Sequence, residues 1–245
     1  MKIRFLGTGA SGGTPGAGRS RRRESSLLAE FGGTRLLVDV TRDFAEQAER
    51  VAGVDAVLLT HSHSDACGGI AQLRTWLRRR GLGPVPLLAA PGTLDDVQRR
   101  FARLDHVVPI AVADGEQRAC GAWRMRPLVV PHALRPYTPT YAWRLSAGGI
   151  TVVYASDVAA LTDRLRDFAT GAKLLAIDGA MWHRRLFSHL TADAVLPELC
   201  VWDVGQIALT QIGRSAPPHE QLERAVRALC PRAFPAYDDL ELTLA

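Results

Sequence analysis

The sequence predicts an α/β fold in which two β-sheets pack against each other and helices cover their outer faces. Strand patterns occur in both halves of the 245-residue chain, with helical segments between them. Hydrophobic residues make up 47% of the chain, which is enough to fill a sizeable core. No long linker or low-complexity stretch divides the halves. We therefore expect residues 1–245 to form a single domain of two packed sheets.

The elements of the first half follow from apolar runs that end at turn residues. The strands 25–31 and 34–40 are joined by Gly32-Gly33, a pair typical of a tight hairpin turn. The helix 69–80 places Ile70, Leu73 and Leu77 on one face, at helical spacing. The further strands predicted here are 2–6, 55–60 and 85–90, and the further helices are 43–51 and 93–103.

The second half begins with short strands that glycine and proline interrupt, followed by an alternation of strands and helices. The apolar run from Lys173 to Ile177 predicts a buried strand. Pro217-Pro218 suits the opening of a helix over 217–229, because a helix start tolerates proline. The other strands predicted are 107–112, 116–130, 141–146, 150–154, 206–210 and two short terminal ones, and the other helices are 158–169 and 191–201.

Composition and charge indicate in which cellular compartment the protein is expected and which kinds of partner it can bind. The four cysteines form no C-x-x-C pair, so neither a zinc knuckle nor a disulfide framework is indicated, and a reducing cytoplasm is the expected location. No window reaches the length of a membrane span and the N-terminus lacks the apolar core of a secretory signal, so no membrane partner is expected. The net charge of +5 suits an anionic substrate, although an arginine-rich soluble surface explains it equally well.

The glycine-rich segment after the first strand imitates a cofactor-binding motif. Gly7-Thr8-Gly9-Ala10-Ser11-Gly12 fits G-x-G-x-x-G, the dinucleotide-binding pattern. That motif requires a helix directly after the loop, whereas the next residues are rich in glycine and include Pro15. We therefore predict a flexible loop beside a site. The run Arg21-Arg22-Arg23 either meets phosphate or is a solvated charge run, and the second explanation is the more common one.

The strongest functional signal is the segment from Leu58 to Gly69. An apolar run ends there in His61, His63 and Asp65, spaced by single residues. Two histidines this close at the end of a buried strand, followed by a carboxylate, are typical of metal ligands rather than of structural core residues. We therefore predict a metal site at the end of this strand.

Further ligand-type side chains stand where later strands end. They are His132, Asp157, Asp178 and Gln211, each at the end of a strand, and His189 at the start of a helix. One edge of the predicted sheets therefore collects polar side chains.

These motifs together resemble the metallo-β-lactamase superfamily. Within it, the chain is most similar to the cyclic-phosphate phosphodiesterase branch, which includes relatives of the phosphonate-pathway phosphodiesterase, and more distantly to tRNA 3′-processing endonucleases. The segments that carry the resemblance are FLGTGASGGTP, LLTHSHSD, VVPH, YASDV, SHLTADAV, LTQI and AYDDLEL, so it covers nearly the whole chain. It implies the metallo-β-lactamase fold, a four-layer αββα sandwich.

The resemblance also implies a metal site. The family motif is H-x-H-x-D-H, followed by a later His, a bridging Asp and a final His. The residues that match its first metal position are His61, His63, His132 and Asp157. We therefore expect one zinc or manganese ion per chain.

The second metal position departs from the family pattern. Asp65 and Asp157 match half of it, while Ala66 and Gln211 stand in place of two expected histidines. Alanine has no ligand atom, and a neutral amide oxygen is a poor ligand for zinc. We therefore expect a weakened or absent second site at Asp65, Asp157 and Gln211. Cys67 stays open as a substitute thiolate ligand.

The resemblance implies roles for the other polar residues. A metal-bound hydroxide is the expected nucleophile, because a bound ion lowers the pKa of its water from ~15.7 toward ~7. Asp65 is expected to orient or deprotonate that water, and His189 to protonate the leaving oxygen. Asp39 and Asp178 are expected to accept hydrogen bonds from ligand histidines, although Asp178 also suits a turn cap. His183 matches no ligand position strongly. His106 and His219 have no expected role and are expected at the surface.

The leading hypothesis is a metal-dependent phosphodiesterase that acts on a small phosphodiester, with cyclic phosphodiesters among the candidate substrates. A nuclease like the tRNA-processing relatives is less favoured, because the chain lacks an obvious inserted arm for gripping tRNA. A non-catalytic homologue that binds a ligand is the alternative from another class, since two metal ligands are missing. A thioester or lactam hydrolase also stays open. The expected partner is a small anionic phosphate ester, and a homodimer is left open.

Overall fold

The computed structural model describes residues 1–132 and 139–245. Its elements up to residue 132 alternate short strands with short helices. They are β1 (Lys2–Gly7), η1 (Gly18–Ser20), β2 (Ser26–Phe31), β3 (Thr34–Val38), α1 (Phe44–Gln47), η2 (Ala48–Arg50), β4 (Ala56–Leu58), α2 (Ser64–Cys67), α3 (Ile70–Arg79), β5 (Val85–Ala89), α4 (Pro91–Arg100), β6 (Val107–Ala111), β7 (Arg118–Cys120) and β8 (Trp123–Val130).

The elements from residue 139 onward repeat this alternation. They are β9 (Thr140–Ala147), β10 (Ile150–Ala155), α5 (Asp163–Ala169), β11 (Ala172–Asp178), α6 (Ala192–Leu199), β12 (Val204–Thr210), α7 (His219–Leu229), β13 (Ala233–Pro235) and β14 (Glu241–Thr243).

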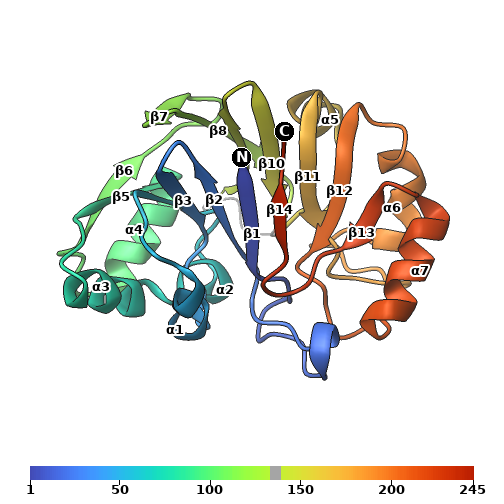
Figure 1. Ribbon diagram of the computed structural model, residues 1–245, viewed down its shortest axis with the longest axis horizontal. Coiled ribbons are helices and arrows are strands. Elements are labelled where there is room, and N and C mark those ends of the chain that lie inside the picture. Colours follow the sequence, from blue (N-terminus) through green and yellow to red (C-terminus); the bar gives the residue numbers. More distant parts are fainter. Residues whose placement is uncertain (133–138) are drawn as a thin grey trace.

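Within the described residues the strands form two seven-stranded sheets. The first has the order β14-β1-β2-β3-β4-β5-β6 and the second the order β13-β12-β11-β10-β9-β8-β7. Figure 1 shows α1 to α4 beside the first sheet on the left, and α6 and α7 beside the second sheet on the right. Strand β14 pairs with β1, so the last strand completes the sheet that the first strand began.

Three clusters of buried apolar side chains define four layers. The cluster between the sheets contains Phe5 of β1 and Trp143 of β9. Leu73 of α3 belongs to the cluster on the outer face of the first sheet, and Leu222 of α7 to the cluster on the outer face of the second. Each such side chain removed from water stabilises the fold by about 1.5–3 kcal/mol. The order helix, sheet, sheet, helix confirms the predicted αββα sandwich.

The two sheets are joined next to the end of β4. Trp143 of β9 is fully buried and donates a hydrogen bond from Nε1 to the carbonyl oxygen of Leu59, over 3.0 Å. The backbone N–H of Tyr141 donates to the carbonyl oxygen of Thr60, over 2.8 Å. These bonds hold the backbone directly before His61, so the segment with the metal-ligand motif has a defined position between the sheets.

Two element boundaries differ from the prediction because turn and capping residues override the apolar pattern. The predicted strand 116–130 is two strands, β7 and β8, because Gly121 turns the chain at a φ of +53°. The helix predicted over 158–169 begins only at Asp163, after Thr162, whose hydroxyl caps it.

Two further helices differ in extent. The helix predicted over 93–103 spans Pro91–Arg100, because proline is accommodated at its first position. The helix α2 has only four residues, too few for a periodic pattern, and the sequence did not predict it. Among the described helices, none combines the length and the apolar content that crossing a bilayer requires.

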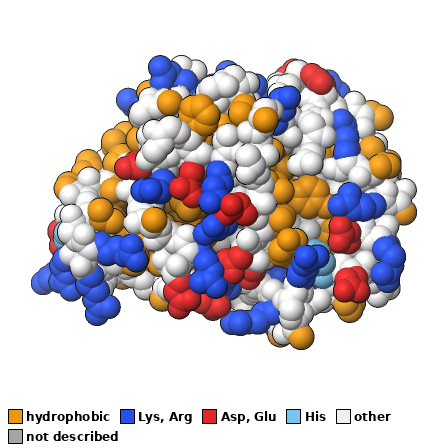
Figure 2. Space-filling model, in the orientation of Figure 1, with side chains coloured by type: hydrophobic (Ala, Val, Ile, Leu, Met, Phe, Trp, Pro, Cys, Tyr) orange, Lys and Arg blue, Asp and Glu red, His pale blue; other side chains and the backbone are white. Residues whose placement is uncertain are grey.

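Two arginines after the glycine loop are buried, which corrects the expectation of a solvated charge run. Arg22 donates from Nη1 to Oγ1 of Thr8 over 2.8 Å, and its Nη2 lies 3.1 Å from Nδ1 of His219. Arg23 pairs with Asp238, Nε to Oδ2, over 3.3 Å. His219 is buried as well, contrary to the surface position expected for it. Figure 2 shows charged side chains of both signs mixed along the middle of one face.

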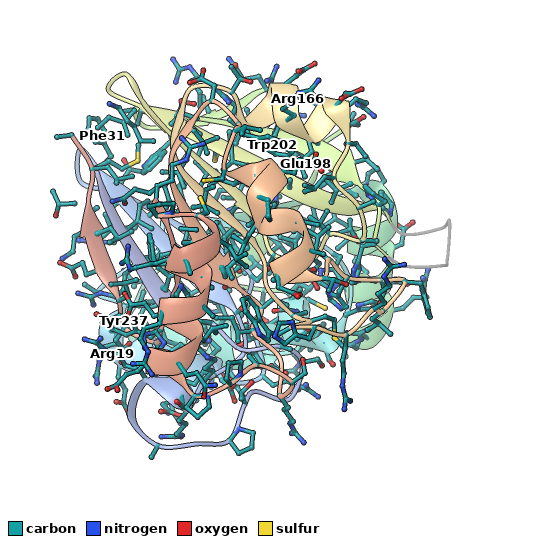
Figure 3. The ribbon with its side chains drawn as sticks, turned by 90° about the vertical axis from the view of Figure 1, so that its right-hand side faces the viewer. Arg19, Phe31, Arg166, Glu198, Trp202 and Tyr237 are labelled. Atoms are coloured by element: carbon teal, nitrogen blue, oxygen red, sulfur yellow. The ribbon has the colours of Figure 1, made fainter. Side chains whose placement is uncertain are left out.

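The glycine-rich loop is tied to the C-terminal half of the chain. The hydroxyl of Thr14 donates to the carbonyl oxygen of Ile212 over 2.8 Å. The guanidinium of Arg19 lies 4.3 Å from the ring centroid of Tyr237, and Figure 3 shows these two side chains together. Only the three-residue 3-10 turn η1 follows the loop, so the helix that a dinucleotide site requires is absent from these described residues.

Candidate functional site

The polar residues predicted at strand ends gather at one edge of the sheets. Strands β10, β11 and β12 run parallel, so their C-terminal ends meet at the same edge. The side chains brought together there are His61, His63 and Asp65 after β4, His132 after β8, Asp157 after β10, Asp178 at the end of β11, His189 before α6 and Gln211 after β12.

Three imidazoles and a carboxylate face one space. The ring centroids of His61 and His63 are 4.5 Å apart, and that of His132 lies 5.3 Å from His61 and 5.5 Å from His63. Oδ1 of Asp157 lies 3.7 Å from Nε2 of His132. Nδ1 of His132 donates to the carbonyl oxygen of Ser188 over 2.8 Å, which turns its Nε2 toward the other histidines.

The orientation of His61 is set by Thr60. The Thr60 hydroxyl lies 2.9 Å from Oδ2 of Asp39 and 2.8 Å from Nδ1 of His61. A carboxylate only accepts, so we assign the hydroxyl as donor to Asp39 and as acceptor from His61, which leaves the lone pair of Nε2 free. Asp39 therefore contacts His61 through the Thr60 hydroxyl. The sequence suggested instead that Asp39 accepts a hydrogen bond directly from a ligand histidine.

The residues fit a divalent cation. In the described part of the structure, Nε2 of His61 is buried and has no hydrogen-bond partner. Burial lowers the pKa of His61 to about 3 although the charge of Asp65 opposes that shift, so the ring is neutral and can act as a ligand. An unpaired buried nitrogen costs about 1–3 kcal/mol, which a bound cation offsets. Three imidazoles and one carboxylate form a donor set that suits zinc.

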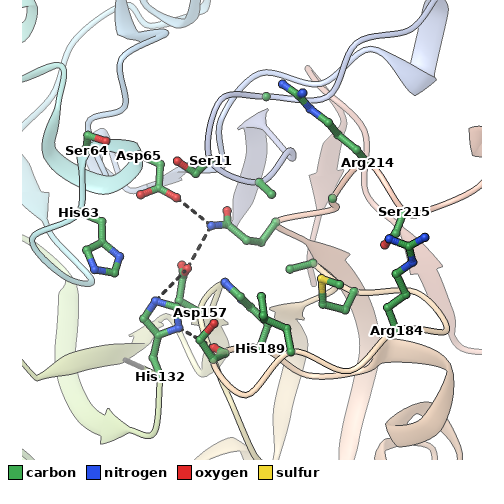
Figure 4. A pocket seen from close by; sticks show the side chains of 18 of the residues that line it. Ser11, His63, Ser64, Asp65, His132, Asp157, Arg184, His189, Arg214 and Ser215 are labelled. Carbon is green, nitrogen blue, oxygen red and sulfur yellow. Dashed lines mark hydrogen bonds and ion pairs between the residues drawn. The ribbon is translucent and has the colours of Figure 1, made fainter. Parts of the chain in front are cut away.

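Gln211 lies between two carboxylates. Its Nε2 donates to Oδ2 of Asp65 and to Oδ1 of Asp157, each over 3.0 Å, and dashed lines in Figure 4 mark both bonds. The residue is buried and has a φ of +57°, a conformation that non-glycine residues adopt only when their surroundings hold them. Its backbone N–H donates to the hydroxyl of Ser25 over 2.8 Å. Gln211 therefore offers the carboxylates an amide N–H group, where the sequence suggested a ligand oxygen.

Half-buried His189 pairs with the fully buried Asp178 beside the imidazoles. Nδ1 of His189 lies 2.7 Å from Oδ2 of Asp178, and the ring centroid lies 4.9 Å from that of His132. Burial by itself lowers the pKa of His189, but the hydrogen bond and the charge of Asp178 outweigh it and raise that pKa. Asp178 also accepts from the backbone N–H groups of Val158 and Ala180, so it caps a turn as well.

A cavity of about 790 Å³ opens onto this site. Its wall includes His63, Asp65, His132, Asp157 and His189, and three arginines, Arg100, Arg184 and Arg214. The glycine-rich loop also contributes to the wall, through Ala10, Ser11 and Gly13. His63 is exposed, so the histidine cluster is open to solvent from the cavity.

Cys67 does not take part in the histidine cluster. Its Sγ donates to the carbonyl oxygen of Ser62 over 3.3 Å and lies 3.2 Å from Nη1 of Arg100. Burial raises the pKa of the Cys67 thiol to about 12, although the charge of Arg100 opposes that shift. Among the described residues, the groups that can hold a metal contain no cysteine.

Two features of the site are missing from the sequence analysis. One is Thr60, directly before the histidine motif. Its contacts with Asp39 and His61 reveal its role, and they are visible only in the structure. Arg184 and Arg214 lie in loops, where sequence gives no indication of side-chain direction. The histidines outside the site are His106; His183, which pairs with Asp193 over 2.6 Å; and His219, which contacts Arg22.

Comparison with known families and proteins gives consistent matches. Residues 34–230 match the family model described as the beta-lactamase superfamily domain. A protein named Ribonuclease Z from Mycobacterium bovis is 31% identical over 198 residues, which cover 71% of this chain and 69% of that protein. A protein of the same name from Bradyrhizobium sp. is 28% identical over 307 residues, and the match covers both chains fully.

Solved structures are similar over the whole length. The crystal structure of a new diphosphatase from the PhnP family superposes with a TM-score of 0.86 at 25% identity, covering 100% of this chain and 98% of that one. The Zn(2+)-bound PqqB from Methylobacterium extorquens superposes with a TM-score of 0.85 at 21% identity, and the match covers both chains fully.

Proposed function

Because the chain belongs to the beta-lactamase superfamily, we propose that it is a metal-dependent hydrolase that cleaves a small phosphodiester. The ligands we propose for one zinc or manganese ion are His61, His63, His132 and Asp157. The observation that carries the proposal is Nε2 of His61, a buried nitrogen with no hydrogen-bond partner among the described residues, facing two further imidazoles.

The roles of the neighbouring residues follow from their positions. A bound cation would supply a nucleophile near neutrality, since it lowers the pKa of a bound water from ~15.7 toward ~7. Oδ1 of Asp65 lies 3.9 Å from Nε2 of His61, so this carboxylate faces the same space and can orient the attacking water. His189, whose pKa is raised, holds a proton for the leaving oxygen, and Asp178 holds its ring in place.

The geometry of Gln211 supports a single cation. In a two-metal site the second ion would draw on Asp65 and Asp157 together. Here both carboxylates accept hydrogen bonds from the amide of Gln211, and the neighbouring Ala66 has no ligand atom. We therefore propose that the amide takes the place of the second ion between the two carboxylates.

The choice of a phosphodiester rests on charge and on the comparisons. The arginines in the cavity wall favour an anionic substrate. A solved structure that is 25% identical is a diphosphatase of the PhnP family. Relatives named Ribonuclease Z make cleavage of an RNA phosphodiester the second candidate.

The test is turnover by protein loaded with zinc or manganese. We expect hydrolysis of bis(p-nitrophenyl) phosphate, its loss in the His63→Ala variant, and its retention in the control His106→Ala, which changes a histidine outside the cavity wall. A precursor tRNA, a lactam and a thioester are the comparison substrates. Loaded protein that binds metal but leaves both the diester and the tRNA intact would contradict the proposal and favour a non-catalytic homologue or another hydrolase.

A further inference from the structure

We infer that Phe187 is a specificity-determining residue for the leaving group, and that the substrate is a phosphodiester whose leaving oxygen carries an aromatic ring. The inference rests on the proposed function, which states the bond that is cleaved, and adds the chemistry of the group that departs. Phe187 lies in the loop between β11 and α6, two residues before His189, the proposed proton donor. It lines the cavity together with Leu186 and Met181.

The side chain of Phe187 is largely open to solvent in the cavity wall. Its exposed fraction is 69%, and that of its neighbour Leu186 is 40%. In the described part of the chain, the other exposed large apolar side chains are Val108, Val201 and Leu229, and none of these lines the cavity. Single apolar side chains at a surface are ordinary. Two adjacent ones in the wall of a binding cavity offer apolar area that a ligand can cover.

The loop that carries Phe187 is held at its base. The backbone N–H of Ala192, at the start of α6, donates to the carbonyl oxygen of Met181 over 2.8 Å, which joins the two ends of the loop. The backbone N–H of Trp182 donates to the hydroxyl of Ser215 over 3.3 Å, which fastens this loop to the one after β12. The base of the loop is therefore fixed on two sides.

Phe187 stands in a tight turn that is bonded to the histidine cluster. The backbone N–H of His189 donates to the carbonyl oxygen of Leu186 over 3.2 Å, so Phe187 and Ser188 are the two central residues of the turn. The carbonyl oxygen of Ser188 accepts from Nδ1 of His132 over 2.8 Å. The turn that orients a proposed metal ligand and carries the proposed proton donor therefore also fixes the place of Phe187.

The position of His189 indicates the side of the cavity on which the leaving group departs. Its ring centroid lies 4.9 Å from that of His132, and both side chains are labelled in Figure 4. Water adds to the phosphorus, and the bond from phosphorus to the leaving oxygen breaks. The proton on His189 goes to that oxygen, and the proton lost by the water goes to Asp65. The group on the leaving oxygen therefore extends past His189, toward the turn that carries Phe187.

The side chains around Phe187 favour an aromatic ring over a hydroxyl-rich group. A phenylalanine ring stacks on another ring or meets its edge. Met181 contributes a thioether, which makes favourable contacts with aromatic rings. Leu186 adds an apolar side chain without hydrogen-bonding groups. An aromatic ring would cover these three side chains, whereas the hydroxyl groups of a sugar would lose their hydrogen bonds to water beside them.

The first test is the binding of three phosphonates to the zinc-loaded protein, measured by calorimetry. Phenylphosphonate, cyclohexylphosphonate and methylphosphonate resist hydrolysis, because a phosphorus–carbon bond replaces the bond to the leaving oxygen. We expect phenylphosphonate to bind about tenfold more tightly than methylphosphonate and about threefold more tightly than cyclohexylphosphonate. Phe187→Ala should abolish the preference for phenyl over cyclohexyl, and Phe187→Tyr, which keeps an aromatic ring, should retain it.

Val201→Ala is the matched control, because Val201 is 82% exposed and lies outside the cavity wall. It should leave all three affinities within about twofold of the parent. A parent that binds phenylphosphonate no more tightly than cyclohexylphosphonate would overturn the inference. The same loss of preference in Val201→Ala as in Phe187→Ala would overturn it as well.

The second test determines which group of the diester meets Phe187. Bis(p-nitrophenyl) phosphate and methyl p-nitrophenyl phosphate share one leaving group and differ in the group that stays on phosphorus. Phe187→Ala should raise KM for both by about fivefold and leave kcat within about twofold, because it removes binding that the ground state and the transition state share. A rise confined to bis(p-nitrophenyl) phosphate would place the ring on the retained group and contradict the inference.

Failure of the inference and failure of the proposed function give different results. If only the inference fails, the loaded protein cleaves bis(p-nitrophenyl) phosphate but shows no preference for phenylphosphonate. If only the proposed function fails, the protein prefers phenylphosphonate through Phe187 and cleaves no phosphodiester.

Discussion

The amide of Gln211 donates a hydrogen bond from Nε2 to Oδ2 of Asp65, over 3.0 Å, and so connects the end of β12 with the start of α2. The same nitrogen donates to Asp157 over 3.0 Å. Two buried carboxylates that face each other would repel unless a positive or hydrogen-bonding group lay between them. An amide N–H₂ group meets that need without a charge and leaves the histidine cluster as the remaining cation site.

Restoring the two missing histidines should restore a second ion. In Ala66→His/Gln211→His, two imidazoles would join Asp65 and Asp157, and the amide that now occupies the carboxylates would be gone. We expect the zinc content after dialysis to rise from one to two ions per chain, measured by elemental analysis. Ala66→His alone, which keeps Gln211 between the carboxylates, is the control and should stay at one. A double variant that binds no more zinc than the parent would refute the role of Gln211.

The hydrogen bonds that link Asp39 through the Thr60 hydroxyl to His61, here called the Thr60 relay, should contribute to metal affinity. Thr60→Val keeps the shape of the side chain but removes the hydroxyl that joins Asp39 to His61. Groups that orient a ligand imidazole typically contribute 10–100-fold to affinity, so we expect a loss of about that size in a competition with a chromophoric chelator. Thr75→Val is the control, because the Thr75 hydroxyl on α3 donates to the carbonyl oxygen of Ala71 in its own helix. Unchanged zinc affinity in Thr60→Val would show that the relay does not position His61.

The pH profile of turnover should depend on Asp178. Because the pKa of His189 is raised, the ring keeps its proton to higher pH, and activity that needs this proton declines as the pH rises through that pKa. Asp178→Asn removes the charge that raises it, so the alkaline limb of kcat/KM for bis(p-nitrophenyl) phosphate should move to lower pH. Asp193→Asn, which alters the exposed His183 pair, should leave the limb in place. If the limb does not move in Asp178→Asn, His189 is not the proton donor.

Stability toward acid should depend on the buried pair of Arg22 and His219. Burial, and the charge of Arg22, lower the pKa of His219, so the folded protein keeps this ring neutral while the unfolded chain protonates it below about pH 6.5. Stability is therefore lost as the pH falls below that value. The free energy of unfolding of the parent should exceed that of His219→Gln at about pH 7.5, and the difference should narrow toward about pH 5. A difference that is constant with pH would contradict this assignment.

The fold and the main cluster were accessible from the sequence because they depend on local pattern. Apolar runs that end in polar residues mark strand ends, and the sheets bring those ends to one edge, where His61, His132 and Asp157 meet. The resemblance to the beta-lactamase superfamily is confirmed by the match over residues 34–230.

The remaining features depend on contacts between distant parts of the chain. Arg22 looks like a surface charge because its partner His219 is 197 residues away. The amide of Gln211 can present either its oxygen or its nitrogen, and only the approach of Asp65 and Asp157 selects the nitrogen. The directions of Arg184 and Arg214 depend on loop contacts such as that between Trp182 and Ser215, which no periodic pattern encodes.

The most direct test of the account is the zinc content of the purified protein, determined by elemental analysis for the parent, His61→Ala, His132→Ala and the control His106→Ala. One ion per chain in the parent and the control, with none in the two cluster variants, is the predicted result. A parent that takes up no ion from zinc-replete buffer, or cluster variants that retain a full equivalent, would contradict the cation site on which the proposed function depends.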